Sequence, residues 1–190
     1  MKILALAGSI RTGSFNKMLL HIAVEGARAK GAEVTHIELR DFHLPLYDPD
    51  QEEREGLPPG ARQLKALFRS HQGLLIASPE NNSSISAVLK NAIDWVSRQE
   101  TDDEPPLQCY KGKIGSIISA SPGRLGGLRG LVQLRLLLSN LGVTVLSDQL
   151  TISAAHEAFD EAGRLQNPKH QKQATEIGSN LAGVLAKLCA

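Results

Sequence analysis

Short apolar runs alternate with longer amphipathic segments along the whole chain. Apolar or alternating runs predict strands at 2–7, 33–39, 73–78, 113–120 and 143–147. Apolar residues at helical spacing predict helices at 16–30, 61–69, 85–96, 127–141 and 168–188. Strands that alternate with helices indicate an α/β fold, with a parallel sheet covered by helices on both faces.

Right-handed crossovers between five such strands fit a three-layer α/β/α sandwich whose sheet has the order 2-1-3-4-5. No internal repeat or composition break is found, so residues 1–190 are predicted to form one domain. In a doubly wound sheet, ligands bind beyond the carboxyl ends of the strands, where the strand order reverses. This rule selects the loops at 8–16, 78–86 and 120–128 as the candidate site.

The first of these loops reads GSIRTGSFN and nearly matches a triphosphate-binding loop. Gly8 and Gly13 have the spacing of that motif, but Ser14 stands where the motif has its lysine. Because that lysine reaches the β- and γ-phosphates, its absence argues against a triphosphate. The loop also lacks the G-x-G-x-x-G pattern of a dinucleotide-binding loop.

Hydrogen-bond donors for an anion are nevertheless concentrated in this loop. Its place between a strand and a helix provides free backbone N–H groups and a favourable helix dipole. Ser9, Ser14 and Asn16 add short polar side chains, and Arg11 adds a positive charge. No acidic residue precedes Glu25. We therefore predict a site for a terminal monophosphate; the alternative is a polar turn in which Ser14 only caps the helix.

The second loop, SPENNSSIS at 78–86, is rich in amide and hydroxyl groups. Residues 81–84 could contact the polar edge of a planar heterocycle, or could simply cap the next helix. Glu80 has no visible partner for acid–base catalysis. We expect a structural role for it instead, bonding to backbone donors or contacting a second subunit.

The third loop, SPGRLGG at 121–127, contains three glycines, which allow a ligand to approach the backbone closely. Arg124 could contact a second substrate that carries a phosphate. The alternative is a flexible connection between strand and helix, with Arg124 as an ordinary surface residue.

Composition places this chain of 190 residues, 42% hydrophobic and 22% charged, among ordinary globular proteins. A net charge of +1 gives no general attraction to nucleic acid or to an anionic membrane. No signal-peptide pattern is found, and no run approaches the about 20 apolar residues that cross a bilayer. Cys109 and Cys189 form no C-x-x-C pair, and the six histidines lack metal-ligand spacing. We therefore expect a cytoplasmic protein without a disulfide or a metal, in which the charged stretches 48–60 and 99–108 are solvated loops.

Together, the three loops resemble those of the NAD(P)H-dependent FMN reductase family, flavoproteins of flavodoxin-like fold that reduce chromate, quinones or azo compounds. GSIRTGSFN matches the family pattern G-S-x-R-x-x-S-x-N, and PENNSSISAVLKNAIDW is similar to P-E-Y-N-x-S-x-P-x-x-L-K-N-A-I-D-W. LPLYD at 44–48 and SPGRLGGLR at 121–129 also resemble family loops. The chain departs from the pattern at Asn81, where the family has tyrosine, and at Ser86, where it has proline.

This resemblance implies FMN as the bound cofactor and NADPH or NADH as the co-substrate. The implied FMN-binding residues of the first loop are Ser9, Arg11, Ser14, Phe15 and Asn16. Those implied around the isoalloxazine are Pro79, Glu80, Asn81, Asn82, Ser83, Ser84, Ile85, Ser121 and Gly123. Arg124 is the candidate for NAD(P)H. No catalytic residue is assigned, because the flavin itself accepts the hydride at N5.

The implied reaction passes electrons from NAD(P)H through FMN to a small molecule: a quinone, an azo compound, a metal oxyanion such as chromate, or free flavin. Two alternatives are a flavodoxin-type electron carrier and a non-enzymatic relative with weakened FMN binding, which Asn81 alone supports. Aromatic content of 4% and a nearly neutral charge favour a reductase over an acidic carrier that clamps FMN between aromatic rings. The family also implies a homodimer or homotetramer. Leucines on more than one face of 127–141 agree with burial against a partner subunit or a neighbouring helix.

Overall fold

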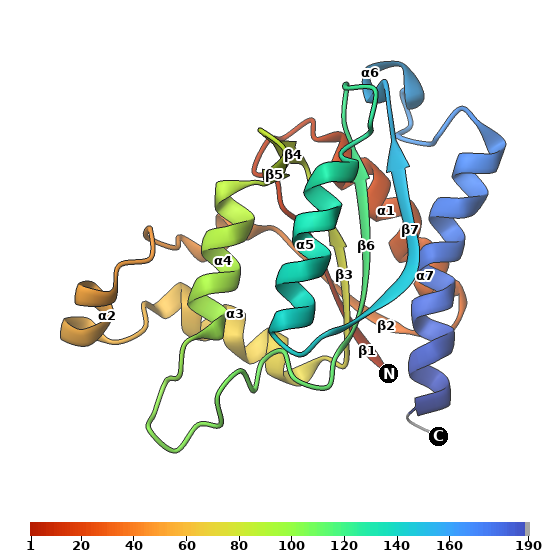
Figure 1. Cartoon of the computed structure of the whole chain (residues 1–190). Helices are drawn as coiled ribbons and strands as arrows, with labels where there is room; N and C mark the ends of the chain where they lie inside the picture. The colour runs from red at the N-terminus through yellow and green to blue at the C-terminus, as the bar shows by residue number, and fades with distance from the viewer. Residues whose placement is uncertain (189–190) are drawn as a thin grey trace.

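A five-stranded parallel sheet forms the centre of the computed structural model, which describes residues 1–188 (Figure 1). In spatial order its strands are β2 (Glu33–Ile37), β1 (Lys2–Ala7), β3 (Gly73–Ala77), β6 (Ile114–Ala120) and β7 (Thr144–Ile152). All neighbouring strands are parallel. Counted along this sheet alone, the order is 2-1-3-4-5, which confirms the predicted doubly wound fold.

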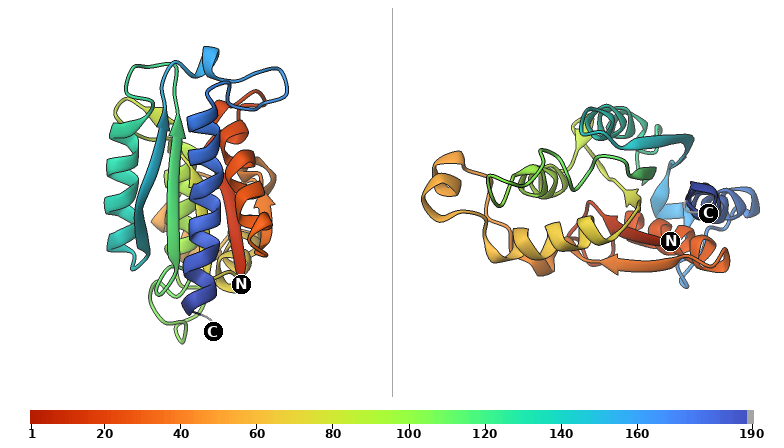
Figure 2. Two further views of the ribbon diagram at one scale, coloured as in Figure 1. Left: turned by 90° about the vertical axis from the view of Figure 1, so that its right-hand side faces the viewer. Right: turned by 90° about the horizontal axis from the view of Figure 1, so that it is seen from below.

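Helices cover both faces of the sheet, as the side view and the view from below in Figure 2 show. One face is covered by α1 (Phe15–Ala29) and α7 (Pro168–Leu188), and the other by α3 (Pro59–Ser70), α4 (Ala87–Ser97) and α5 (Leu128–Asn140). Side chains that alternate along β1 and β3 enter two separate cores, one on each face. This two-sided burial explains why these strands are apolar throughout.

A close crossing with α7 fixes the position of α1, the helix that follows the first loop. A Cβ atom on Gly26 would lie 2.0 Å from the carbonyl oxygen of Thr175, and one on Gly178 would lie 1.8 Å from that of Ala23. Only glycine allows the two backbones to approach this closely. The N-terminus of α1 is therefore held at the carboxyl edge of the sheet by packing along the helix.

The two stretches predicted to be solvated loops contain structure that their charged composition concealed. Within 48–60 lies the helix α2 (Pro49–Glu55), whose N-cap Asp48 accepts a hydrogen bond from the N–H of Asp50. The stretch 99–108 is anchored by Glu104, whose carboxylate lies 2.7 Å from the fully buried ammonium group of Lys65. The expectation of a fully solvated loop at 99–108 is therefore wrong, because a buried cation from α3 requires a partner there.

Other differences concern the ends of elements and short elements. The edge strand β7 continues to Ile152, beyond the predicted end at position 147. A 3₁₀ turn (Leu39–Phe42) and the short helix α6 (Ala155–Ala158) have no periodic signal in the sequence. Within residues 1–188, no helix has the length and apolar character needed to cross a membrane. The prediction that Cys189 forms no disulfide concerns a residue outside the described part of the chain.

Candidate functional site

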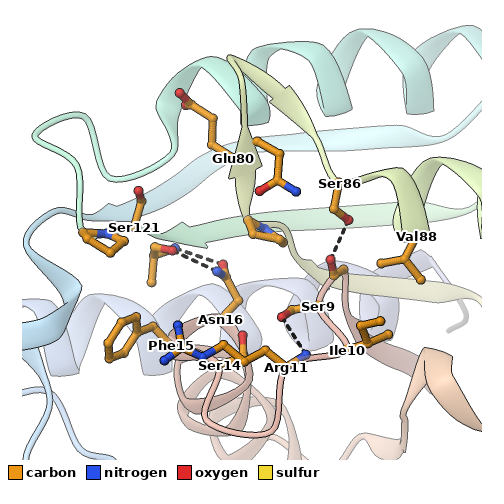
Figure 3. A pocket seen from close by; sticks show the side chains of 15 residues that line it. Ser9, Ile10, Arg11, Ser14, Phe15, Asn16, Glu80, Ser86, Val88 and Ser121 are labelled. Carbon is orange, nitrogen blue, oxygen red and sulfur yellow. Dashed lines mark hydrogen bonds between the residues drawn. The ribbon is translucent and has the colours of Figure 1, made fainter.

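The loops that follow β1, β3 and β6 meet at the carboxyl edge of the sheet and enclose a pocket of about 350 Å³ (Figure 3). Nine of the predicted cofactor-binding residues line it: Ser9, Arg11, Ser14, Phe15, Asn16, Pro79, Glu80, Asn81 and Ser121. The pocket is also lined by Gly8, Ile10, Ser86, Val88, Ala120 and Pro122. Segments more than a hundred residues apart in the chain thus contribute to one cavity.

The N-terminus of α1 opens into this pocket. Ser14 occupies the N-cap position with an extended backbone (φ −80°, ψ 124°), yet its hydroxyl makes no capping hydrogen bond. The N–H groups of Phe15 and Asn16 belong to the first helical turn, where no carbonyl within the helix can accept them. No acidic residue lies in this turn. The helix end therefore presents unused donors and positive potential to the pocket.

The helices that follow the other two loops of the pocket, α4 and α5, are capped by protein groups. At α4, the hydroxyl of Ser86 accepts the N–H of Leu89 at 3.2 Å. At α5, one carboxylate oxygen of Glu80 accepts the N–H groups of Arg129, at 3.0 Å, and Gly130, at 3.2 Å. Of these three helices within residues 1–188, only α1 lacks a side-chain cap. An anion entering the pocket therefore finds one free helix N-terminus.

Side chains of the first loop add further donors. The guanidinium group of Arg11 is exposed, and it has no hydrogen-bond or ion-pair partner in the described part of the chain. The hydroxyl of Ser9 accepts the N–H of Arg11 at 3.3 Å, a local bond within the loop. Ser14 is only 6% exposed, and its hydroxyl remains without a capping role. These groups surround the free helix end.

Asn16 has a different role in the structure from the simple donor that the sequence suggested. Its amide Nδ2 donates to the carbonyl of Ala120 at 2.8 Å, and its Oδ1 accepts the N–H of Ala120 at 3.0 Å. The side chain is therefore a buried tie between α1 and the end of β6, and the backbone N–H of Asn16 is the group left available in the first turn of α1. Phe15 stacks on Phe159, with ring centroids 6.0 Å apart and planes 10° from parallel.

The second loop is a tight hairpin made of β4 (Glu80–Asn81) and β5 (Ser84–Ile85). Asn82 and Ser83 form its turn with positive φ angles of 51° and 65°, the backbone twist that suits a two-residue connection. The hairpin lies against α5, where a Cβ atom on Gly130 would come within 3.2 Å of the Ser84 carbonyl oxygen. Sequence analysis missed this hairpin because its strands are only two residues long.

Glu80 holds the hairpin on α5. Besides capping the helix, its carboxylate lies 2.7 Å from the guanidinium group of Arg129, and its side chain is only 9% exposed. In Figure 3 it points away from the first loop, toward the helix. This is the structural role expected for Glu80, fulfilled by backbone donors.

The remaining predicted residues lie outside the pocket. Asn82, Ser84 and Ile85 line a neighbouring groove of about 640 Å³ between the hairpin, α4 and α5. Ser83, Gly123 and Arg124 line neither hollow. Asn81 borders both the pocket and the groove. Asn81, which stands where the family pattern has tyrosine, thus lies at the boundary between the pocket and the groove.

The glycines of the third loop are required by its own backbone. Gly127 has a φ of 93°, and a Cβ atom there would lie 1.9 Å from the hydroxyl of Ser119. Gly126 has a φ of 61° and would bring a Cβ atom within 2.8 Å of the backbone of Ile152. Close approach to a ligand, the predicted reason for this glycine cluster, is therefore needed at most at Gly123.

A family model described as NADPH-dependent FMN reductase matches residues 1–157, a span that includes all three loops. The chain belongs to this family. The assignment confirms the predicted flavodoxin-like oxidoreductase with FMN and NAD(P)H as its cofactors.

Similarity to individual relatives extends over most of their length. A protein named NAD(P)H-dependent FMN reductase, from Pseudomonas aeruginosa, is 40% identical over 171 residues, 89% of this chain and 86% of the relative. A protein named quinone reductase, from Escherichia coli strain K12, is 35% identical over 147 residues, 77% of this chain and 74% of the relative. The solved structure of FerB, a flavoenzyme NAD(P)H:(acceptor) oxidoreductase from Paracoccus denitrificans, superposes with a TM-score of 0.79. It covers 98% of this chain and 97% of FerB at 24% identity, and so supports the fold alone.

In this reductase, the pocket offers binding groups rather than proton-transfer groups. Glu80 is the one carboxylate among its lining residues, and it is bonded to α5.

Sequence reasoning also missed Ile10 and Val88, the apolar residues beside the first loop. An isoleucine among polar loop residues was the sequence signal that could have identified Ile10, whose side chain is 48% exposed in the structure. Within residues 1–188, no group of three or more histidine, cysteine or acidic side chains is placed to hold a metal ion.

Proposed function

We propose that the pocket holds FMN with its phosphate at the N-terminus of α1, for the transfer of electrons from NAD(P)H to a quinone. When bound, FMN would supply the two-electron redox chemistry between NAD(P)H and the acceptor, and the residues of the pocket would hold and orient it. The observation that carries the proposal is the single uncapped helix end at the pocket.

Residues of the first loop fit a monophosphate dianion. The N–H groups of Phe15 and Asn16 and the hydroxyl of Ser14 converge at the helix end, and the guanidinium group of Arg11 balances the charge. The lysine that would reach further phosphates is absent, in keeping with a ligand that ends in one phosphate.

The isoalloxazine would lie between the hairpin and the third loop. Pro79, Asn81 and Ser121 line this part of the pocket, and Ile10 and Val88 add apolar contacts. Phe15, the one aromatic residue of the lining, is stacked on a neighbouring ring and is not placed to clamp the flavin. An unclamped flavin face suits direct contact with NAD(P)H and an acceptor, which supports a reductase over a flavodoxin-type carrier.

A quinone is the proposed acceptor because relatives with substantial identity are named quinone reductases. Azo compounds, chromate-like oxyanions and free flavin remain predicted alternatives that turnover measurements can rank. The exposed Arg124 remains the candidate for contacting the 2′-phosphate of NADPH, from a position outside the pocket.

A second copy of the chain is the proposed partner of α5. Leu128, Val132 and Leu136 follow one another at intervals of four residues and are 39%, 56% and 58% exposed. They form an apolar stripe on the side of the helix that faces away from the sheet. Burial of this stripe would support the homodimer or homotetramer expected for the family.

The experiment compares FMN and riboflavin binding in wild type and in an Arg11→Ala/Ser14→Ala double variant. The wild-type protein should carry a flavin absorbance spectrum and oxidise NADPH or NADH with a quinone. The double variant should bind FMN about 100-fold more weakly, because it loses a charged and a neutral phosphate donor, while riboflavin binding should stay constant. Arg28→Ala, at the opposite end of α1, is the matched control. Full FMN retention by the double variant would place the phosphate elsewhere, and turnover without any bound flavin would disprove the mechanism.

A further inference from the structure

Ser86 connects the start of α4 to the first loop. Its hydroxyl donates to the carbonyl of Gly8 at 2.5 Å and accepts the N–H of Leu89 at 3.2 Å, as Figure 3 shows for the Gly8 bond. A hydroxyl has one proton and two lone pairs, so both bonds form together. Ser86 is 5% exposed, and water has little access to compete for either bond.

Gly8 is held from three directions. Its N–H donates to the carbonyl of Ala77 at 2.8 Å, which extends the pairing of β1 with β3 by one residue. A Cβ atom on Gly8 would lie 2.9 Å from Cδ2 of Leu89, so the backbone lies directly against α4. In residues 1–188, the Ser86 hydroxyl makes the one side-chain hydrogen bond that links loop 8–14 to α4.

We propose that Ser86 is a positioning residue that holds the first loop in its phosphate-binding shape. The proposal rests on the function proposed above. The loop after Gly8 contains Ser9 and Arg11 and leads to the free end of α1. The orientation of the Gly8 peptide therefore determines the path of this loop and the positions of its donors. A loop fixed before binding loses less conformational entropy when it closes on a phosphate. Ser86 therefore controls affinity for the phosphate end of the cofactor and leaves affinity for its ring system unchanged.

The family pattern has proline at this position, and that difference provides the sharpest variant. Ser86 has φ −68° and ψ 150°, which proline adopts without strain. Its N–H precedes the helix and makes no hydrogen bond in the described part of the chain. Ser86→Pro thus keeps the backbone and removes the hydroxyl, Ser86→Ala removes the hydroxyl alone, and Ser86→Thr keeps it.

Dissociation constants for FMN and for riboflavin, measured with each purified flavin-free variant, test the proposal. Ser86→Pro and Ser86→Ala should bind FMN about tenfold more weakly, whereas riboflavin binding should change by less than about twofold. Ser86→Thr should retain wild-type FMN affinity. Ser97→Ala, which removes a hydroxyl at the other end of α4, is the control and should change neither constant.

Two results would overturn the proposal: unchanged FMN affinity in Ser86→Pro, or equal losses for FMN and riboflavin. Hydrogen exchange of the amides at 9–14 provides a readout that needs no flavin. These amides should exchange faster in Ser86→Pro than in Ser97→Ala, and equal rates would show that the hydroxyl does not hold the loop. A wild-type protein that binds no FMN would remove the proposed function, while the exchange rates would still decide the role of Ser86.

Discussion

Replacing Glu80 with alanine should destabilise the protein mainly by uncapping α5. The carboxylate accepts two backbone N–H groups of the first turn, from Arg129 at 3.0 Å and from Gly130 at 3.2 Å. Loss of an N-cap costs about 1 kcal/mol, and loss of a negative charge beside a helix N-terminus adds about 0.5–1 kcal/mol. Because Arg129 is 59% exposed, its ion pair adds less than about 1 kcal/mol.

Together these contributions predict that Glu80→Ala lowers the free energy of unfolding by about 1.5–3 kcal/mol. For a chain of this size, the melting temperature should fall by about 6 °C. Urea denaturation, followed by circular dichroism, measures the change without the charge screening that guanidinium introduces. Glu80→Gln keeps an acceptor but loses the charge, and should cost about half as much.

Arg129→Ala is the matched variant, since it removes the guanidinium group and leaves the cap intact. It should cost less than about 1 kcal/mol, and the coupling energy between the two positions should be equally small. If Arg129→Ala costs as much as Glu80→Ala, the ion pair rather than the cap stabilises the hairpin, and the reasoning is refuted.

Four further changes test other parts of the structure. Lys65→Met leaves the carboxylate of Glu104 buried without its cation, and urea denaturation should show a loss of about 3 kcal/mol, partly recovered by adding Glu104→Gln. Burial lowers the pKa of His36 below its ordinary 6.5, so near pH 6 the unfolded chain binds more protons than the folded one. The free energy of unfolding should therefore fall as the pH drops below about 6.5, and His36→Asn should flatten that part of the pH profile; an unchanged profile would contradict the assignment. Gly127→Ala should cost about 2–3 kcal/mol through its positive φ and the hydroxyl beneath it, and a neutral thermal melt would argue against that geometry. Leu136→Glu should shift the mass in solution from oligomer to monomer, measured by light scattering, and an unchanged mass would remove α5 from the interface.

Hydrophobic periodicity was sufficient to predict the architecture. Runs such as KILALA are apolar throughout because both faces of the central strands are covered, and this pattern is local to each strand. Once strands and helices alternate, right-handed crossovers leave one common topology, and that topology selects the loops at the switch point. The position of the pocket was therefore available from the periodicity and the topology. Nine of its lining residues were also predicted, several of them, such as Phe15 and Ser121, only through the family resemblance.

Charged and very short segments were less predictable. The hairpin β4–β5 has strands of two residues, too few for a period to be recognised. Composition made 99–108 look solvated, because a buried glutamate is uncommon unless a cation pairs with it. That cation, Lys65, lies on α3, 39 residues away in the chain.

The amino-acid sequence by itself determined the sheet, its order and the three loops that surround the pocket. Only the tertiary structure decided which polar groups of those loops are free to bind a ligand. Asn16 pairs with a peptide 104 residues away, and Glu80 caps a helix that begins about 50 residues later. Ser86 bonds to a carbonyl 78 residues before it. The physical reason is that burial patterns are properties of single elements, whereas each hydrogen bond needs a partner that only the packed fold brings within reach. What remains free after these pairings is the N-terminus of α1, with Ser14 and Arg11 beside it.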